Sequence, residues 1–127
     1  MTDATATVTI DAAPERIWHA LTDPATIAQY FLGTHVDTDW KVGSPIVFRG
    51  EYQGNAYEDH GEVLAFEPGK LFRITHFSGD VRHVVAWELD GTTVRITQSE
   101  NTSEAEVAQA EQTWAMVLGN LKDLLER

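Results

Sequence analysis

The sequence contains no cysteine, few basic residues and no long hydrophobic run. The absence of cysteine excludes a disulfide framework, a thiolate nucleophile and a cysteine-based zinc site. Nine lysines and arginines against twenty aspartates and glutamates give a formal net charge of -11, which argues against binding to nucleic acid or to anionic membranes. No apolar run approaches the ~18 residues of a membrane span, and the N-terminus lacks the basic start of a signal peptide. We therefore expect a cytoplasmic protein that contacts neither membranes nor nucleic acid.

The size and composition of the chain are those of one globular domain. It has 127 residues, of which 43% are hydrophobic and 23% charged. A chain of this length fits a single domain that can bury a core, even a hollow one. Neither a linker, nor a repeat, nor a low-complexity stretch divides it. We expect residues 1–127 to form one domain.

The first part of the chain predicts a strand followed by two short helices. Small polar residues alternate with Val8 and Ile10, a period of two that predicts a strand over residues 5–12. Pro14 suits the first position of a helix over residues 14–22, which ends before Pro24. A second helix is expected over residues 25–31.

The middle of the chain predicts an antiparallel meander. Six strands are expected, over residues 34–39, 45–52, 56–67, 70–77, 82–90 and 93–101. The breaks between them carry turn residues, and Asp90-Gly91 is the strongest hairpin signal. Short connections between successive strands imply antiparallel pairing.

The last segment predicts a long amphipathic helix over residues 104–126. Ser103 and Glu106 have the spacing of a capping box, which marks its start. Apolar residues then recur on one face, among them Trp114, Leu118 and Leu121. A helix of this length needs a broad apolar partner, and we expect the concave face of the sheet to provide it.

The order of elements and several short motifs resemble the helix-grip fold of the START-like superfamily, which includes polyketide cyclases. Within it, the sequence resembles the branch named after the activator of the heat-shock-protein ATPase. The matching segments are APERIW at residues 13–18, ALTDP at 20–24, AQYF at 28–31, GS at 43–44, GEVL at 61–64, EP at 67–68, and Trp114, Leu118 and LKDLL at 121–125. The resemblance covers nearly the whole chain and implies an α+β fold with a curved antiparallel sheet around a long C-terminal helix. Two positions depart from the family pattern, because Tyr30 replaces a tryptophan and Gly43-Ser44 replaces a pair of glycines.

The alternation within strands predicts which side chains point inward. Phe72, Ile74 and His76 share one face, and we place it inside because burial of Arg73 on the other face would be costly. The same test places the following residues inside: Ile46, Phe48, Tyr57, Asp59, Gly61, Val63, Ala65, Val85, Trp87, Leu89, Val94, Ile96 and Gln98.

In a helix-grip fold the sheet and the long helix enclose a cavity, and aromatic walls with sparse polar groups are typical of small-molecule sites. The expected polar points are Tyr57, Asp59, His76, His83 and Gln98. The candidate ligand-binding residues are Tyr30, Phe48, Tyr57, Phe72, His76, Trp87, Gln98, Trp114 and Leu118. Most of these residues also have a structural interpretation: the aromatic residues as plain core, Gln98 as a satisfied structural amide, and His76 as core or strand end. Asp59, among the polar points, has the alternative of a solvated strand end.

The sequence gives little support for a metal or catalytic centre. The five histidines are scattered, and no two have the i, i+4 spacing of a helical zinc site. Alternate residues of the YEDHG segment at 57–61 point to opposite faces of a strand, so they cannot converge locally. We expect no metal, no cofactor and no assigned catalytic residue, although a His76/Asp59 pair could carry out acid–base chemistry.

Three functions remain open. The first is binding of a hydrophobic, apolar or aromatic small molecule in the cavity, by a monomer or a homodimer. The second is an enzyme of the cyclase or hydrolase type that acts on a ketide-like substrate. The third is a chaperone-regulating interaction module, which the family name suggests. A solid core would favour the interaction module, and a polar pocket with a perturbed histidine would favour catalysis.

Overall fold

Seven strands form one antiparallel sheet in the computed structural model, which describes residues 3–127. The strands are β1 (Ala4–Thr9), β2 (His35–Asp37), β3 (Pro45–Tyr52), β4 (Asn55–Glu67), β5 (Leu71–Ser78), β6 (Val81–Asp90) and β7 (Thr93–Ser99). The helices are α1 (Pro14–Thr22), α2 (Pro24–Tyr30) and α3 (Glu104–Leu125). The strand order is β1-β7-β6-β5-β4-β3-β2. Strands β2 to β7 therefore form a simple meander, and β1 pairs with the last strand, β7. The predicted α+β helix-grip fold is confirmed.

The boundaries differ from the predicted ones mainly at strand ends. The first strand ends at Thr9 rather than at residue 12, because Ile10 and Ala12 turn toward α1 through a hydrogen bond between the Ala12 N–H and the Ile10 carbonyl. The second strand has three residues instead of six, and the last strand ends at Ser99 instead of residue 101.

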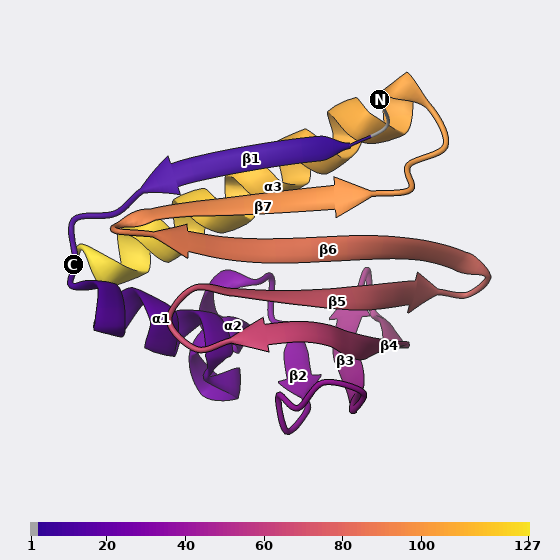
Figure 1. Ribbon diagram of the computed structural model, residues 1–127. Coiled ribbons are helices and arrows are strands. Elements are labelled where there is room, and N and C mark those ends of the chain that lie inside the picture. The colour runs from indigo at the N-terminus through magenta and orange to yellow at the C-terminus, as the bar shows by residue number, and fades with distance from the viewer. Residues whose placement is uncertain (1–2) are drawn as a thin grey trace.

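Helix α3 lies along one side of the sheet, against β1 and β7 (Figure 1). Helix α1 reaches β4 and β5 through Trp18, and α2 contacts β2. The buried face of α3 includes the three predicted residues Trp114, Leu118 and Leu121. The predicted face of this helix is therefore confirmed. The helix lies toward the β1 side of the sheet, whereas we expected it to lie across the concave face.

Side chains of α3 cover the free edge of β1. The Thr5 N–H donates to Glu111 Oε2 at 3.1 Å, and Lys122 Nζ donates to the Thr9 carbonyl at 2.8 Å. Just beyond the strand, the Asp11 N–H donates to Glu126 Oε2 at 2.8 Å. An uncovered edge can pair with another chain, so these contacts also protect β1 from edge-to-edge association.

Helix α1 ends where proline removes a hydrogen-bond donor. The Ala20 carbonyl would accept from residue 24 in a continuing helix, but Pro24 has no N–H. The buried Tyr30 hydroxyl donates to this carbonyl instead, at 3.0 Å. The Thr22 carbonyl accepts from Trp40 Nε1 at 3.1 Å. Two aromatic side chains from later in the chain thus satisfy the end of α1.

Strand β4 contains a register shift between Val63 and Ala65 that reverses which face its later residues occupy. Phe66, not Ala65, pairs with the buried Phe72, and Ala65 pairs with the exposed Arg73. The inward placement of Ala65 predicted from simple alternation is therefore wrong.

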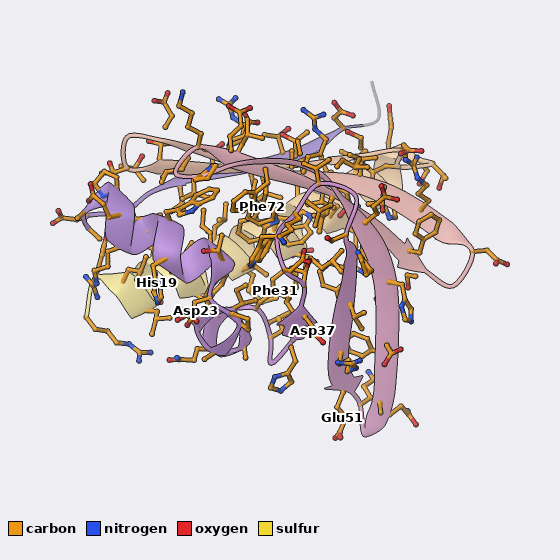
Figure 2. All side chains as sticks on the ribbon, turned by 60° about the horizontal axis from the view of Figure 1, so that its bottom comes forward. His19, Asp23, Phe31, Asp37, Glu51 and Phe72 are labelled. Atoms are coloured by element: carbon orange, nitrogen blue, oxygen red, sulfur yellow. The ribbon has the colours of Figure 1, made fainter. Side chains whose placement is uncertain are left out.

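Figure 2 shows how the sheet curves. Phe31 and Phe72 lie in the crowded interior, whereas Asp37 and Glu51 lie on the β2–β4 region that extends away from the long helix. The concave side of this curve carries the candidate site.

Candidate functional site

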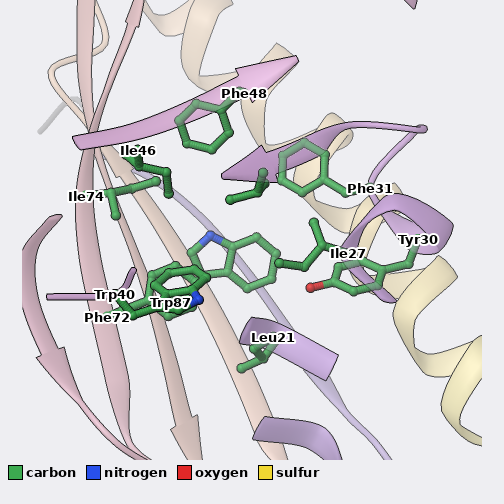
Figure 3. Close-up of a pocket in the computed structure, with 11 residues that line it drawn as sticks. Leu21, Ile27, Tyr30, Phe31, Trp40, Ile46, Phe48, Phe72, Ile74 and Trp87 are labelled. Atoms are coloured by element: carbon green, nitrogen blue, oxygen red, sulfur yellow. The ribbon is translucent and has the colours of Figure 1, made fainter. Parts of the chain in front are cut away.

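An apolar cavity of about 20 Å³ lies between the sheet and the segment that runs from α1 to β3. A space of this size holds about one water molecule. Its walls are Leu21, Ile27, Tyr30, Phe31, Val36, Trp40, Ile46, Phe48, Phe72, Ile74 and Trp87. Figure 3 shows Tyr30 and Phe31 on one side of the cavity and Phe72 and Trp40 on the other. All its walls are hydrophobic or aromatic, so the cavity suits an apolar occupant.

Trp87 on β6 connects the aromatic side chains around the cavity. Its ring lies 5.9 Å from Phe72 in a stacked arrangement and 6.2 Å from Phe31, measured between ring centroids. Tyr30 and Trp114 meet it edge-on, at 6.4 and 5.8 Å. Aromatic pairs at such distances and angles stabilise a core beyond their buried area.

Trp40 closes one side of the cavity from the loop between β2 and β3. Its ring packs 4.8 Å from Phe72 and 5.8 Å from Phe66, again between centroids. Its backbone has a φ of 62°, a left-handed conformation that a bulky residue adopts only at an energetic cost. The indole is half-buried and held by one hydrogen bond, the one to the Thr22 carbonyl.

Tyr30 forms the opposite wall with a hydroxyl that is already used. The side chain is 1% exposed and donates to the Ala20 carbonyl. Burial raises the pKa of Tyr30 far above its ordinary value, so the phenol is neutral at any physiological pH. Tyr30 therefore contributes an apolar ring surface to the cavity.

Beyond Phe48 and Ile74 the concave face becomes polar. Asp59 on β4 and His76 on β5 are joined by a hydrogen bond of 2.9 Å between Oδ2 and Nε2. The His76 ring stacks on Phe48, with 4.5 Å between centroids. The predicted pair of His76 and Asp59 thus exists, and it adjoins a wall of the cavity.

A second histidine–carboxylate pair lies beside the first. His83 on β6 is the direct cross-strand partner of His76, and its Nε2 lies 3.1 Å from Glu106 Oε1 on α3. Glu106 also accepts from the Thr102 backbone N–H at 2.9 Å. These two hydrogen bonds, that of His83 first, lower the pKa of Glu106. We call Asp59, His76, His83 and Glu106 the polar row.

Gln98 is a satisfied structural amide, one of the two alternatives that the sequence left open. Its Oε1 accepts from Trp114 Nε1 at 2.8 Å, and its Nε2 donates to Asn101 Oδ1 at 2.8 Å. Asn101 in turn donates to the Gln98 carbonyl at 2.8 Å. The network joins β7 to the middle of α3 and to the segment before that helix.

The structure brings together only part of the predicted ligand-binding set. Tyr30, Phe48, Phe72 and Trp87 line the cavity, and His76 adjoins it. The remaining four, Tyr57, Gln98, Trp114 and Leu118, do not line it. The Tyr57 hydroxyl forms a hydrogen bond of 3.0 Å with Thr34 Oγ1, in which either group can be the donor. The cavity is bounded by α1 and α2 rather than by α3, because Trp114 fills the space between α3 and Trp87.

Phe31 and Trp40 are the two aromatic wall residues among those that sequence reasoning missed, which also include Leu21, Ile27 and Val36. Both aromatic residues lie outside the strands, where alternation gives no information. A signal was present at Trp40, because a tryptophan between Asp39 and Lys41 in a polar loop requires a burial partner.

In the described part of the chain, no three histidine, aspartate or glutamate side chains are grouped so that they could hold a metal ion. Among residues 3–127, no helix is long and apolar enough to cross a membrane.

Comparisons with known proteins agree with the fold. A family model described as Activator of Hsp90 ATPase homolog 1-like protein matches residues 11–126. ChR145 from Cytophaga hutchinsonii is 38% identical, with a TM-score of 0.83 over 98% of this chain and 93% of its own. The Aha1 dimer from Colwellia psychrerythraea is 25% identical, with a TM-score of 0.77 over 99% of this chain and 97% of its own.

A third similar structure is DynU16, a putative protein in the dynemicin biosynthetic locus. It is 25% identical, with a TM-score of 0.86, and the match covers 99% of this chain but 48% of DynU16. A search of the curated proteins finds no match.

Proposed function

The chain belongs to the Activator of Hsp90 ATPase homolog 1-like family, and from that premise we propose that it binds a flat, apolar or aromatic small molecule in the cavity beneath Trp87. Tyr30, Phe48, Phe72 and Trp87 would form the binding walls. The ligand would enter where Trp40 now lies.

The proposal rests on the loop position, backbone conformation and partial exposure of Trp40. The cavity holds only about one water molecule, so a larger ligand must displace a side chain. Trp40 is the wall residue best suited to move, because it combines loop position, a left-handed backbone and partial exposure. Its displacement would expose an aromatic slot against Phe72.

The shape of the slot favours a flat ligand. The indole of Trp40 packs against Phe72 and Phe66, so a molecule that takes its place would contact the same two rings. Because the walls of the cavity are hydrophobic or aromatic, the buried part of the ligand would be apolar.

A direct test measures the binding of indole, which matches the displaced side chain, by isothermal titration calorimetry. Wild-type protein should bind indole, and Trp40→Ala should bind it more tightly, because the ligand no longer competes with the side chain. At a free indole concentration of 100 times Kd, binding would also raise the free energy of unfolding by about 2.7 kcal/mol.

The matched control is Trp18→Ala. Trp18 is also half-buried and packs on the same two phenylalanines, at 5.7 Å from Phe66 and 6.2 Å from Phe72, but it does not line the cavity. This variant should lose stability without gaining affinity. Absence of binding to wild-type protein, or an equal gain in both variants, would contradict the proposal.

Two similar structures bear on what the protein does in a cell. DynU16, as a putative protein in a biosynthetic locus, supports a role that involves a small molecule.

The family description supports the alternative of chaperone regulation, which an Hsp90 ATPase assay with and without this protein would test. The Colwellia Aha1 dimer favours the homodimer over the monomer for this chain, a question for analytical ultracentrifugation.

A further inference from the structure

The two histidine–carboxylate pairs of the polar row have the same hydrogen-bond arrangement. An ionised carboxylate only accepts hydrogen bonds, so the imidazole nitrogen that faces it must carry a proton. In His76 that nitrogen is Nε2, which lies 2.9 Å from Asp59, and in His83 it is Nε2, which lies 3.1 Å from Glu106. In a neutral ring, the other nitrogen, Nδ1, then keeps its lone pair and accepts a hydrogen bond.

The Nδ1 atoms are available to a ligand. Within residues 3–127, neither Nδ1 atom has a hydrogen-bond partner, and no buried side-chain nitrogen or oxygen is left unsatisfied. Neither atom is therefore completely buried. The side chains themselves are largely buried, with 26% of His76 and 16% of His83 exposed, so their rings are held in place.

His76 is the acceptor within reach of the cavity. It follows the wall residue Ile74 by two positions on the same face of β5, a distance of about 7 Å along a strand. Its ring also stacks on Phe48, another wall residue. A ligand packed against Ile74 and Phe48 would carry its outer substituent to the His76 ring.

We propose that the polar row recognises a hydroxyl or N–H donor on the ligand, so that the natural ligand is an aromatic molecule with a phenol-type group at one end. The aromatic body lies in the cavity, and the donor binds His76 Nδ1. Asp59 acts as a positioning residue, because its hydrogen bond fixes which imidazole nitrogen accepts. This inference rests on the proposed ligand-binding function.

Charge supports a neutral donor over an anion. Asp59 on β4 and Glu106 on α3 flank the two histidines from both sides, and Tyr57 is the other titratable group nearby on the same face of β4. An anionic substituent beside two carboxylates would be repelled, whereas a hydroxyl gains a hydrogen bond without that cost. A ligand carboxylate is therefore disfavoured.

The test compares 2-naphthol with 2-methoxynaphthalene, which has the same ring system without a donor, by isothermal titration calorimetry at pH 8. Wild-type protein should bind 2-naphthol about fivefold more tightly, the effect of one ordinary hydrogen bond. His76→Leu should abolish this preference while both compounds still bind. His60→Leu, which removes an exposed histidine of β4, should keep it.

The protonation of the histidines offers a test that needs no variant. Nitrogen-15 NMR of wild-type protein at neutral pH should find the proton of His76 on Nε2 and the lone pair on Nδ1. A proton on Nδ1 alone, or equal affinity of wild-type protein for the two compounds, would overturn the inference and leave the proposed function standing. Failure of both compounds and of indole to bind would overturn the proposed function, and this inference with it.

Discussion

Trp114 on α3 donates its indole N–H to the side-chain oxygen of Gln98 on β7, at 2.8 Å. This contact fixes the Trp114 ring between helix and sheet, where it meets Trp87 edge-on at 5.8 Å. The space beneath α3 is therefore filled, and the remaining cavity lies beneath α1 and α2.

The same contact predicts the effect of Gln98→Leu. The substitution removes the acceptor of the buried Trp114 N–H and the hydrogen bond from Gln98 to the Asn101 side-chain oxygen. Because an unsatisfied buried polar group costs about 1–3 kcal/mol, the free energy of unfolding should fall by that amount. Urea denaturation measures it.

Two further variants separate hydrogen bonding from other effects of Gln98→Leu. Gln112→Leu, on the exposed side of α3, should change stability by less than about 0.5 kcal/mol. Adding Trp114→Phe to Gln98→Leu should cost less than the sum of the two single changes, since the phenyl ring has no N–H to satisfy. Strict additivity would show that the contact contributes nothing.

Much of the fold was predictable because periodicity reports burial directly. The repeat of Trp114, Leu118 and Leu121 identified the buried face of α3, and the capping residue Ser103 identified its start. The alternation of Phe72 and Ile74 with Arg73 placed the correct face of β5 inside.

The remaining features depend on contacts between distant segments. Nothing in local alternation marks the register shift after Val63, which sends Phe66 inward. The lateral position of α3 depends on its contacts with the edge of β1, such as that between Glu111 and Thr5. The role of Trp40 depends on Thr22, which is 18 residues away. The wall residues on β3, β5 and β6 were therefore predictable, whereas Val36 on the short strand β2 and the loop residues were not.

Two glycine substitutions should have opposite effects on stability. A Cβ atom on Gly61 would lie 1.8 Å from the Thr75 carbonyl oxygen, which is backbone and cannot move aside without separating β4 from β5. Gly61→Ala should therefore destabilise by about 2–3 kcal/mol or more. Gly119→Ala, in the interior of α3 with no neighbouring atom within 4 Å, should stabilise by about 0.5–1 kcal/mol. Thermal or urea unfolding of both variants would show the difference, and equal signs would refute the close approach at Gly61.

The buried Tyr30 predicts a loss of stability at alkaline pH. Because burial raises its pKa in the folded state, the folded protein keeps a proton that the unfolded chain releases above pH 10. The contribution of Tyr30 is therefore complete below pH 10 and is lost as the pH rises further, by up to about 1.4 kcal/mol per pH unit.

Tyr30→Phe should remove this dependence and make the decline above pH 10 shallower. At neutral pH it should cost about 1 kcal/mol, because the Ala20 carbonyl loses its donor. Stability measured in urea from pH 7 to 11 tests both effects. If stability fell equally with pH in wild-type protein and in Tyr30→Phe, this result would contradict the burial of the phenol.

The four tryptophans provide the most direct test of ligand binding in the cavity, because each has one indole N–H signal in a proton–nitrogen NMR spectrum. On addition of indole, the Trp40 signal should move most, since its hydrogen bond to the Thr22 carbonyl breaks, and the Trp87 signal should move with it. The Trp18 signal should move less than either, because Trp18 lies outside the cavity walls and contacts them only through Phe66 and Phe72. Unchanged Trp40 and Trp87 signals at saturating indole, or shifts confined to Trp18, would contradict the account.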